Sequence, residues 1–220
     1  MATKSELVQC VARQLALPSE TVSVVDRLLA ESGLRRMAGR GRGAAHMNEA
    51  DAAALLIGAC VPGPLKSVCE RVRAFLELPF KGSEVRDAGQ KIPFPSVSNS
   101  PDDHTFGEAL TAVLRAATRG EIKAYLAAEA DRREDKRIPN LWGLEVEFFT
   151  PGQTAFIRFF DRNLSVRNRY DQIPNDMDRD QLNAWAKEVN SDPSHGDLSV
   201  ACRFTSRTIF AIAELIKGKA

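Results

Sequence analysis

The first eighty residues carry apolar side chains every three or four positions, the period of an α-helix with one buried face. This spacing predicts four helices, over residues 5–15, 19–32, 49–59 and 65–78. The residues between them fit helix ends, because Ser19 and Asn48 are good N-caps and Gly33 suits the left-handed position that follows a helix. The N-terminal part of the chain is therefore expected to be mainly helical.

The second half of the chain mixes the periods of helices and strands. Helices are predicted over residues 105–134 with an interruption at Gly120, over 180–189 around Trp185, and over 205–217. LEVEFFT and AFIRFF alternate about Pro151-Gly152, which predicts a β-hairpin, and LSVRNRY and residues 198–204 add two further candidate strands. The strands are grouped rather than alternating with helices, so the fold class is expected to be α+β with a small antiparallel sheet.

Residues 81–104 lack either period and are rich in Gly, Pro, Ser, Asn and Asp. Such a segment is typical of a linker. We therefore expect a helical domain over residues 1–80, a linker over 81–104, and a mixed domain over 105–220.

Composition and charge narrow the range of functions. The chain has 220 residues and a net charge of only +1, so any affinity for nucleic acid has to come from a local patch. No run of about 18 apolar residues occurs, so no membrane span is expected, and the N-terminus lacks the apolar segment of a signal peptide. The four cysteines are scattered without paired spacing, which indicates reduced thiols in a cytoplasmic protein.

Residues 11–47 read VARQLALPSETVSVVDRLLAESGLRRMAGRGRGAAHM, two predicted helices joined by about three residues and followed by a basic, glycine-rich segment. This arrangement fits a helix-turn-helix. With Thr21-Val22-Ser23, Arg27-Leu28 and Gly33-Leu34, residues 4–47 resemble winged helix-turn-helix regulators. The resemblance implies that the second helix enters the major groove and that a glycine-rich hairpin follows as a wing. The chain departs from the pattern at Ala16, where the turn usually has glycine, and it lacks the helix that often precedes the motif.

A second and looser resemblance concerns the stretch GRGRGAAHMNEADAAALLIG. It is similar to a segment of uncharacterised phage and prophage proteins, which carry no assigned activity. The resemblance implies a phage-type regulator or a protein that recognises DNA during packaging.

The candidate DNA contacts lie on the second helix and on the segment after it. With the apolar face turned inward, the helix offers its other side chains to base edges: Ser19, Glu20, Thr21, Ser23 and Arg27. Side chains on the glycine-rich segment can approach phosphates or enter a minor groove: Arg35, Arg36, Arg40, Arg42 and His46. Residues 1–80 nevertheless carry only ten basic against eight acidic residues, so non-specific affinity should be modest.

The expected function is sequence-specific binding of double-stranded DNA. A homodimer is expected because one short helix reads only a few base pairs, and residues 105–220 would dimerise or hold a protein partner. The candidate interface residues are on the last helix: Phe210, Ile212 and Ile216. The alternative is a non-enzymatic phage adaptor whose helical N-terminal domain binds another protein.

Other groups of residues in the sequence give weaker signals of function. Arginines 158, 162, 167 and 169 lie among aromatic residues that could stack the bases of a single strand, but a half-buried sheet with Ile157 and Phe159 inward is favoured. The three histidines are far apart in the sequence and lie in no nucleophile motif. Cys60 and Cys69 suit core packing better than a zinc site, so neither an enzyme nor a metal or other cofactor is expected.

Overall fold

The computed structural model describes residues 2–37, 46–85, 91–132, 142–150, 152–173, 177–191 and 200–218. The helices are α1 (Lys4–Leu15), α2 (Ser19–Glu31), α3 (Glu49–Cys60), η2 (Leu65–Ser67), α4 (Val68–Leu76), α5 (Pro95–Ser98), α6 (Phe106–Thr118), α7 (Glu121–Asp131), α8 (Arg179–Ser191) and α9 (Ser206–Lys217). The strands are β1 (Phe80–Val85), β2 (Gly143–Thr150), β3 (Thr154–Phe160), β4 (Ser165–Asp171) and β5 (Val200–Thr205). The expected α+β class is confirmed. Among the described residues, no helix is both long and apolar enough to span a membrane.

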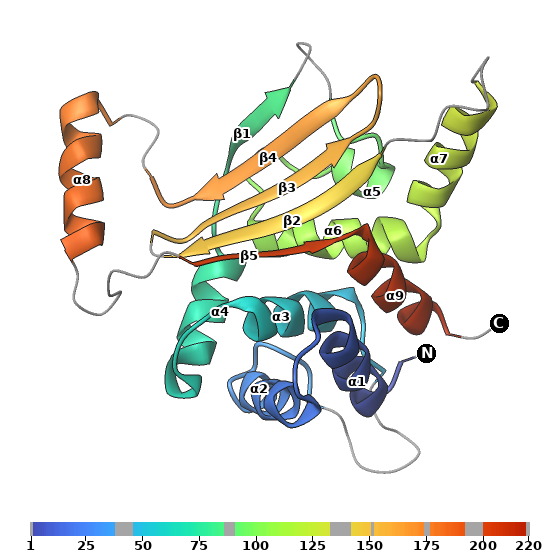
Figure 1. The fold of residues 1–220 in the computed structure, drawn as a ribbon, viewed down its shortest axis with the longest axis horizontal. Helices are drawn as coiled ribbons and strands as arrows, with labels where there is room; N and C mark the ends of the chain where they lie inside the picture. Colours follow the sequence, from blue (N-terminus) through green and yellow to red (C-terminus); the bar gives the residue numbers. More distant parts are fainter. Residues whose placement is uncertain are drawn as a thin grey trace.

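The strands form one antiparallel sheet in the order β1-β4-β3-β2-β5 (Figure 1). Strand alternation sorts its side chains, so that Val146 pairs with Ile157 on one side and with Phe204 on the other, and all three are buried. Ile157 and Phe159 face inward as predicted, and both are fully buried. One face of the sheet therefore closes the core, while the other carries polar and charged residues.

The prediction of a linker over residues 81–104 is wrong, because residues 80–85 form strand β1. This strand pairs with β4, from Phe80 opposite Tyr170 to Val85 opposite Val166. The turn-forming residues lie within the fold: Gly82 adopts a φ of +128° at an irregularity of β1, and Pro95 begins the short helix α5. Farther along the same segment three apolar side chains are buried in the core: Ile92, Phe94 and Val97.

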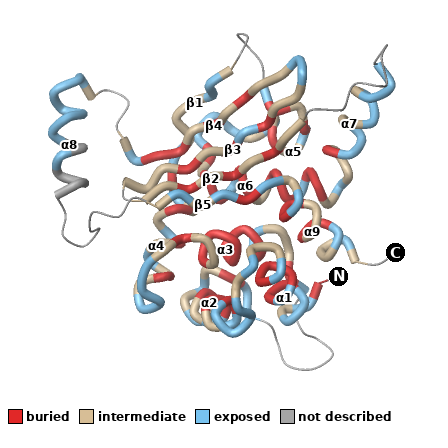
Figure 2. Tube along the Cα trace, viewed as in Figure 1, coloured by how far each residue is buried: buried red, intermediate tan, exposed pale blue. Residues whose placement is uncertain are grey.

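A single hydrophobic core joins the two halves of the chain (Figure 2). Helix α1 packs against α9 and α3 packs against α6. Phe75 of α4 meets Phe148 of β2 edge to face, with ring centroids 5.7 Å apart. Ile212 of α9 is fully buried in this core, so it is not available for the dimer interface suggested by the sequence. The division into separate domains at 1–80 and 105–220 does not match this packing.

Several helix ends follow the sequence signals. Asn48 forms a capping box with Asp51 at the start of α3, as expected. Gly33 and Gly120 have φ values of +75° and +80°, and Gly120 separates α6 from α7. The prediction for Ser19 is wrong, because α2 already includes it and the capping position falls on Pro18, which has no side-chain donor or acceptor.

Candidate nucleic-acid interface

Helices α1 and α2 are joined by a tight turn. Ala16 follows α1 with φ +53° and ψ +40°, the left-handed conformation that glycine adopts most readily. The backbone N–H of Leu17 then donates to the carbonyl of Ala12 at 2.9 Å. Alanine thus takes the conformation expected of the usual turn glycine, at some conformational cost.

The buried side of α2 packs against neighbouring helices. Val22, Val25 and Leu29 are almost completely buried there. A Cβ on Gly58 of α3 would lie only 2.8 Å from a methyl group of Val25, so α2 and α3 approach each other closely. The orientation of α2 is therefore fixed by its packing.

The opposite side of α2 is exposed, as the sequence predicts. The side chains expected to read bases all lie on the surface: Ser19, Glu20, Thr21, Ser23 and Arg27. The Arg27 side chain is 63% exposed, and its Nε lies 3.9 Å from Oε1 of Glu31, one turn further on. An exposed ion pair at that separation is weak, so Arg27 can leave Glu31 for another partner.

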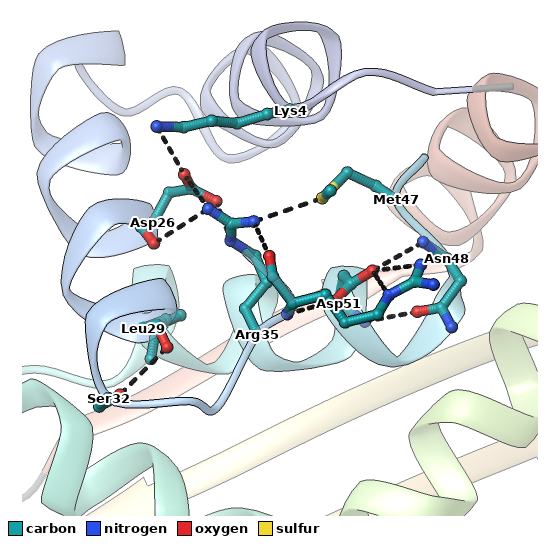
Figure 3. Close-up of polar contacts among 9 residues, drawn as sticks. Lys4, Asp26, Leu29, Ser32, Arg35, Met47, Asn48 and Asp51 are labelled. Carbon is teal, nitrogen blue, oxygen red and sulfur yellow. Dashed lines mark hydrogen bonds and ion pairs between the residues drawn. The ribbon is translucent and has the colours of Figure 1, made fainter. Parts of the chain in front are cut away.

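Arg35, in contrast, is buried and cannot serve as a DNA contact. Its Nη2 donates to Oδ2 of Asp26 at 2.8 Å, and its Nε makes a 2.6 Å ion contact with Oδ1 (Figure 3). The two side chains are only 2% and 1% exposed. Lys4 adds a third charge, with Nζ 3.3 Å from Asp26. Arg35 is buried because Asp26 lies on the buried side of α2 and needs a partner of opposite charge there.

Arg36 is also engaged within the chain. Its Nε and Nη2 donate to Oδ2 of Asp51 at 3.0 and 2.8 Å, and its backbone N–H donates to Oδ1 at 3.0 Å. Asp51 is nearly buried and is also the acceptor for the backbone N–H of Asn48 in the capping box. Half of the Arg36 side chain remains exposed, so it can approach a phosphate only at the edge of this network.

The same two arginines bring together the residues that flank segment 38–45. Arg36 donates to the carbonyl of His46 at 2.6 Å. Nη1 of Arg35 lies 3.5 Å from the sulfur of Met47 (Figure 3). His46 itself is exposed. Arg40, Arg42 and the expected wing hairpin lie outside the described residues. The described residues on either side of this segment therefore lie together beside α2.

A sequence signal could have identified the buried pair. Val22, Val25, Asp26 and Leu29 follow the spacing of one helix face, so Asp26 falls among residues that are certain to be buried. A carboxylate in that position requires a cationic partner, and Arg35 and Arg36 are close in the sequence. The burial of one of these arginines was thus foreseeable, although the choice between them was not.

The open face of the sheet carries the second basic cluster. Arg167 lies over the ring of Phe156, 3.6 Å from its centroid, and Arg158 lies over Phe160 at 4.7 Å. Three carboxylates offset these charges: Glu84, Glu145 and Glu147, each within 4 Å of an arginine nitrogen. This arrangement agrees with the favoured interpretation of a solvated outer face, on which arginines lie beside carboxylates.

A hollow of about 800 Å³ lies beside α6 and α5 and includes His104 in its lining. The Nε2 atom of His104 is 3.1 Å from the hydroxyl of Tyr170, and burial raises the pKa of that hydroxyl. Within the described part of the chain, no three His, Cys, Asp or Glu side chains gather closely enough to hold a metal ion.

Comparison of the chain with protein-family models, with curated proteins and with solved structures gives no match. The resemblance to winged helix-turn-helix regulators therefore stays a prediction from residues 4–47.

Proposed function

We propose that this chain is a sequence-specific double-stranded DNA-binding protein of the regulator type, and that α2 reads the bases. The observation that carries the proposal is the exposed polar side of α2, which lies opposite the tightly packed Val22, Val25 and Leu29. A helix held in this way can enter a major groove without rearranging its own packing. The loose resemblance to prophage proteins supports a phage-type regulator.

In this proposal, the side chains of α2 contact bases and those of segment 38–45 contact phosphates. Arg27 is long and exposed and can donate two hydrogen bonds to a guanine, worth about 1–3 kcal/mol of discrimination. Thr21 and Ser23 can contact a phosphate or a thymine methyl group. Arg40 and Arg42, which follow the described residue Met37 in the sequence, would supply phosphate contacts. A homodimer would place two copies of α2 on neighbouring half-sites.

The test of this proposal begins with selection of bound fragments from a random pool of double-stranded DNA. The preference of the wild type for the selected site is then compared with that of Arg27→Ala. We expect the preference to fall roughly 5- to 150-fold while the Tm stays unchanged. Arg203→Ala is the matched control, because Arg203 is also exposed and also lies near a glutamate at 3.7 Å, but on β5.

Two outcomes would contradict the proposal in different ways. Enrichment of a site whose preference survives Arg27→Ala would mean that another element reads the bases. Failure to enrich any sequence would favour the second candidate, a protein-binding adaptor. One observation speaks for that candidate. The described arginines 27, 35 and 36 all lie near carboxylates of the chain, so little free arginine charge remains among the described residues of α2 and the segment after it.

The contribution of segment 38–45 can be measured separately. Replacing both arginines, in Arg40→Ala/Arg42→Ala, should weaken binding to all DNA sequences similarly. The slope of log K against log salt should become shallower by about 1.8, since each phosphate contact contributes about 0.9. A slope equal to that of the wild type would remove this segment from the interface.

A further inference from the structure

The fold brings together two cysteines that are 142 positions apart. Cys60 ends helix α3 and Cys202 lies in strand β5, and both are free, half-buried thiols. The sulfur of Cys202 is 2.8 Å from the carbonyl oxygen of Cys60. The sequence offered no sign of this contact, because its two partners are far apart along the chain.

The contact limits how far apart the two residues can be. From standard bond lengths, a sulfur at 2.8 Å from the Cys60 carbonyl oxygen places the two Cα atoms at most about 8 Å apart. Disulfides usually join Cα atoms about 4.4–6.8 Å apart, so a small shift suffices. Both positions permit such a shift, because Cys60 is the last residue of α3 and β5 is at the edge of the described sheet.

We propose that Cys60 and Cys202 are a disulfide-forming pair that is oxidised by a small-molecule disulfide such as oxidised glutathione. The thiolate of Cys202 attacks one glutathione sulfur, which forms a mixed disulfide and releases one glutathione. The thiolate of Cys60 then attacks the sulfur of Cys202 and releases the second glutathione. The two protein thiols are oxidised, one glutathione disulfide is reduced, and the two protons pass to the released thiols.

Burial sets the order and the pH dependence of these steps. It raises the pKa of Cys60 to about 12, with a smaller contribution from the neighbouring Cys202, and it also raises the pKa of Cys202. The thiolate is the attacking form, so oxidation is expected to be slow at neutral pH and faster as the pH rises. Because Cys60 is the more strongly desolvated of the two, Cys202 is the better first nucleophile.

The bond would have a structural consequence for the proposed DNA-binding part. It would tie the end of α3, against which α2 packs, to the edge of the sheet. Closing a loop of this length restricts the unfolded chain, and the Tm of the oxidised protein should exceed that of the reduced protein by roughly 10 °C.

The test uses the whole protein with millimolar oxidised glutathione at a pH of about 8.5, followed by alkylation of the remaining thiols. Digestion without reduction and mass spectrometry should then give the two peptides containing Cys60 and Cys202 as one species, two hydrogens lighter than their sum. Cys69→Ser should keep this species, since Cys69 is a half-buried cysteine whose sulfur contacts Leu28 instead, at 3.4 Å. Cys202→Ser should lose it.

Three results would overturn the proposal. They are glutathione adducts that persist on both cysteines, a cross-link that joins Cys10 or Cys69 instead, and no oxidation at all in a day at that pH. Because DNA binding is measured on reduced protein, none of these results bears on the proposed function.

Discussion

The buried pair of Asp26 and Arg35 gives the strongest prediction about stability. The two side chains are almost inaccessible to water, so removing one of them leaves an uncompensated charge in the core. Such a change typically lowers the free energy of unfolding by about 3–5 kcal/mol. The remaining neighbours decide where each single variant falls in this range.

The two single variants should differ because Lys4 contacts only the acidic partner. In Arg35→Met, Asp26 keeps Lys4 at 3.3 Å, so we expect a loss of about 3 kcal/mol. In Asp26→Leu, the described partners left to the buried guanidinium are the backbone carbonyls of residues 26 and 36 and the sulfur of Met47, and we expect a loss of about 4 kcal/mol. The double variant replaces both charges by apolar groups and should lose only about 1–2 kcal/mol, for the unpaired carbonyls.

Urea unfolding followed by circular dichroism would measure the three values and their coupling energy in a double-mutant cycle. Arg27→Ala is the control, because an exposed arginine on the same helix should change the free energy of unfolding by about 0.5 kcal/mol or less. Losses below about 1 kcal/mol for both single variants would show that the pair is solvated. The account of residues 35–37 and 46–48 as a fixed base beside α2 would then be wrong.

Two further predictions concern the turn and the shared core. Ala16→Gly should raise the free energy of unfolding by about 1 kcal/mol, because glycine has no steric cost at φ +53°. Ala128→Gly on the exposed side of α7 is the control and should lower the free energy of unfolding by a similar amount. If urea unfolding gave changes of the same sign for both variants, the left-handed turn at Ala16 would be wrong. Residues 1–80 alone should show no cooperative thermal unfolding by circular dichroism, because Phe75 loses Phe148 and α1 loses α9; a sharp transition would restore the division into two domains.

Local signals in the sequence identified most of the helices and strands. The break at Gly120, the capping box at Asn48 and the alternation of β2 and β3 all depend on neighbouring residues, and the structure agrees with each. The position of β1 depends instead on a partner about ninety residues away. Its sequence FKGSEV has no apolar alternation, because Gly82 and the irregularity beside it interrupt the pattern. A short stretch of sequence does not contain the information that determines pairing between strands so far apart along the chain.

The candidate site was also predictable only in part, where its features depend on neighbouring residues. The exposed side of α2 follows from helical geometry, and all five predicted residues are on the surface. Whether each arginine is paired within the chain or exposed depends on where carboxylates lie in three dimensions. Asp26 and Asp51 come from two different helices, and the contact of Cys202 with Cys60 requires the full fold. Residue type alone could not separate a DNA contact from a structural charge.

The distribution of carboxylates now suggests how the four arginines share their roles. No acidic residue occurs between Glu31 and Glu49, so this stretch carries its charge without local neutralisation. Arg35 and Arg36 are nevertheless neutralised, because the fold brings Asp26 and Asp51 to them. Both of these carboxylates already accept hydrogen bonds from described donors of the chain. For the proposed binding of DNA, the salt dependence of binding, rather than the composition of the segment, is therefore the measurement that decides the role of Arg40 and Arg42.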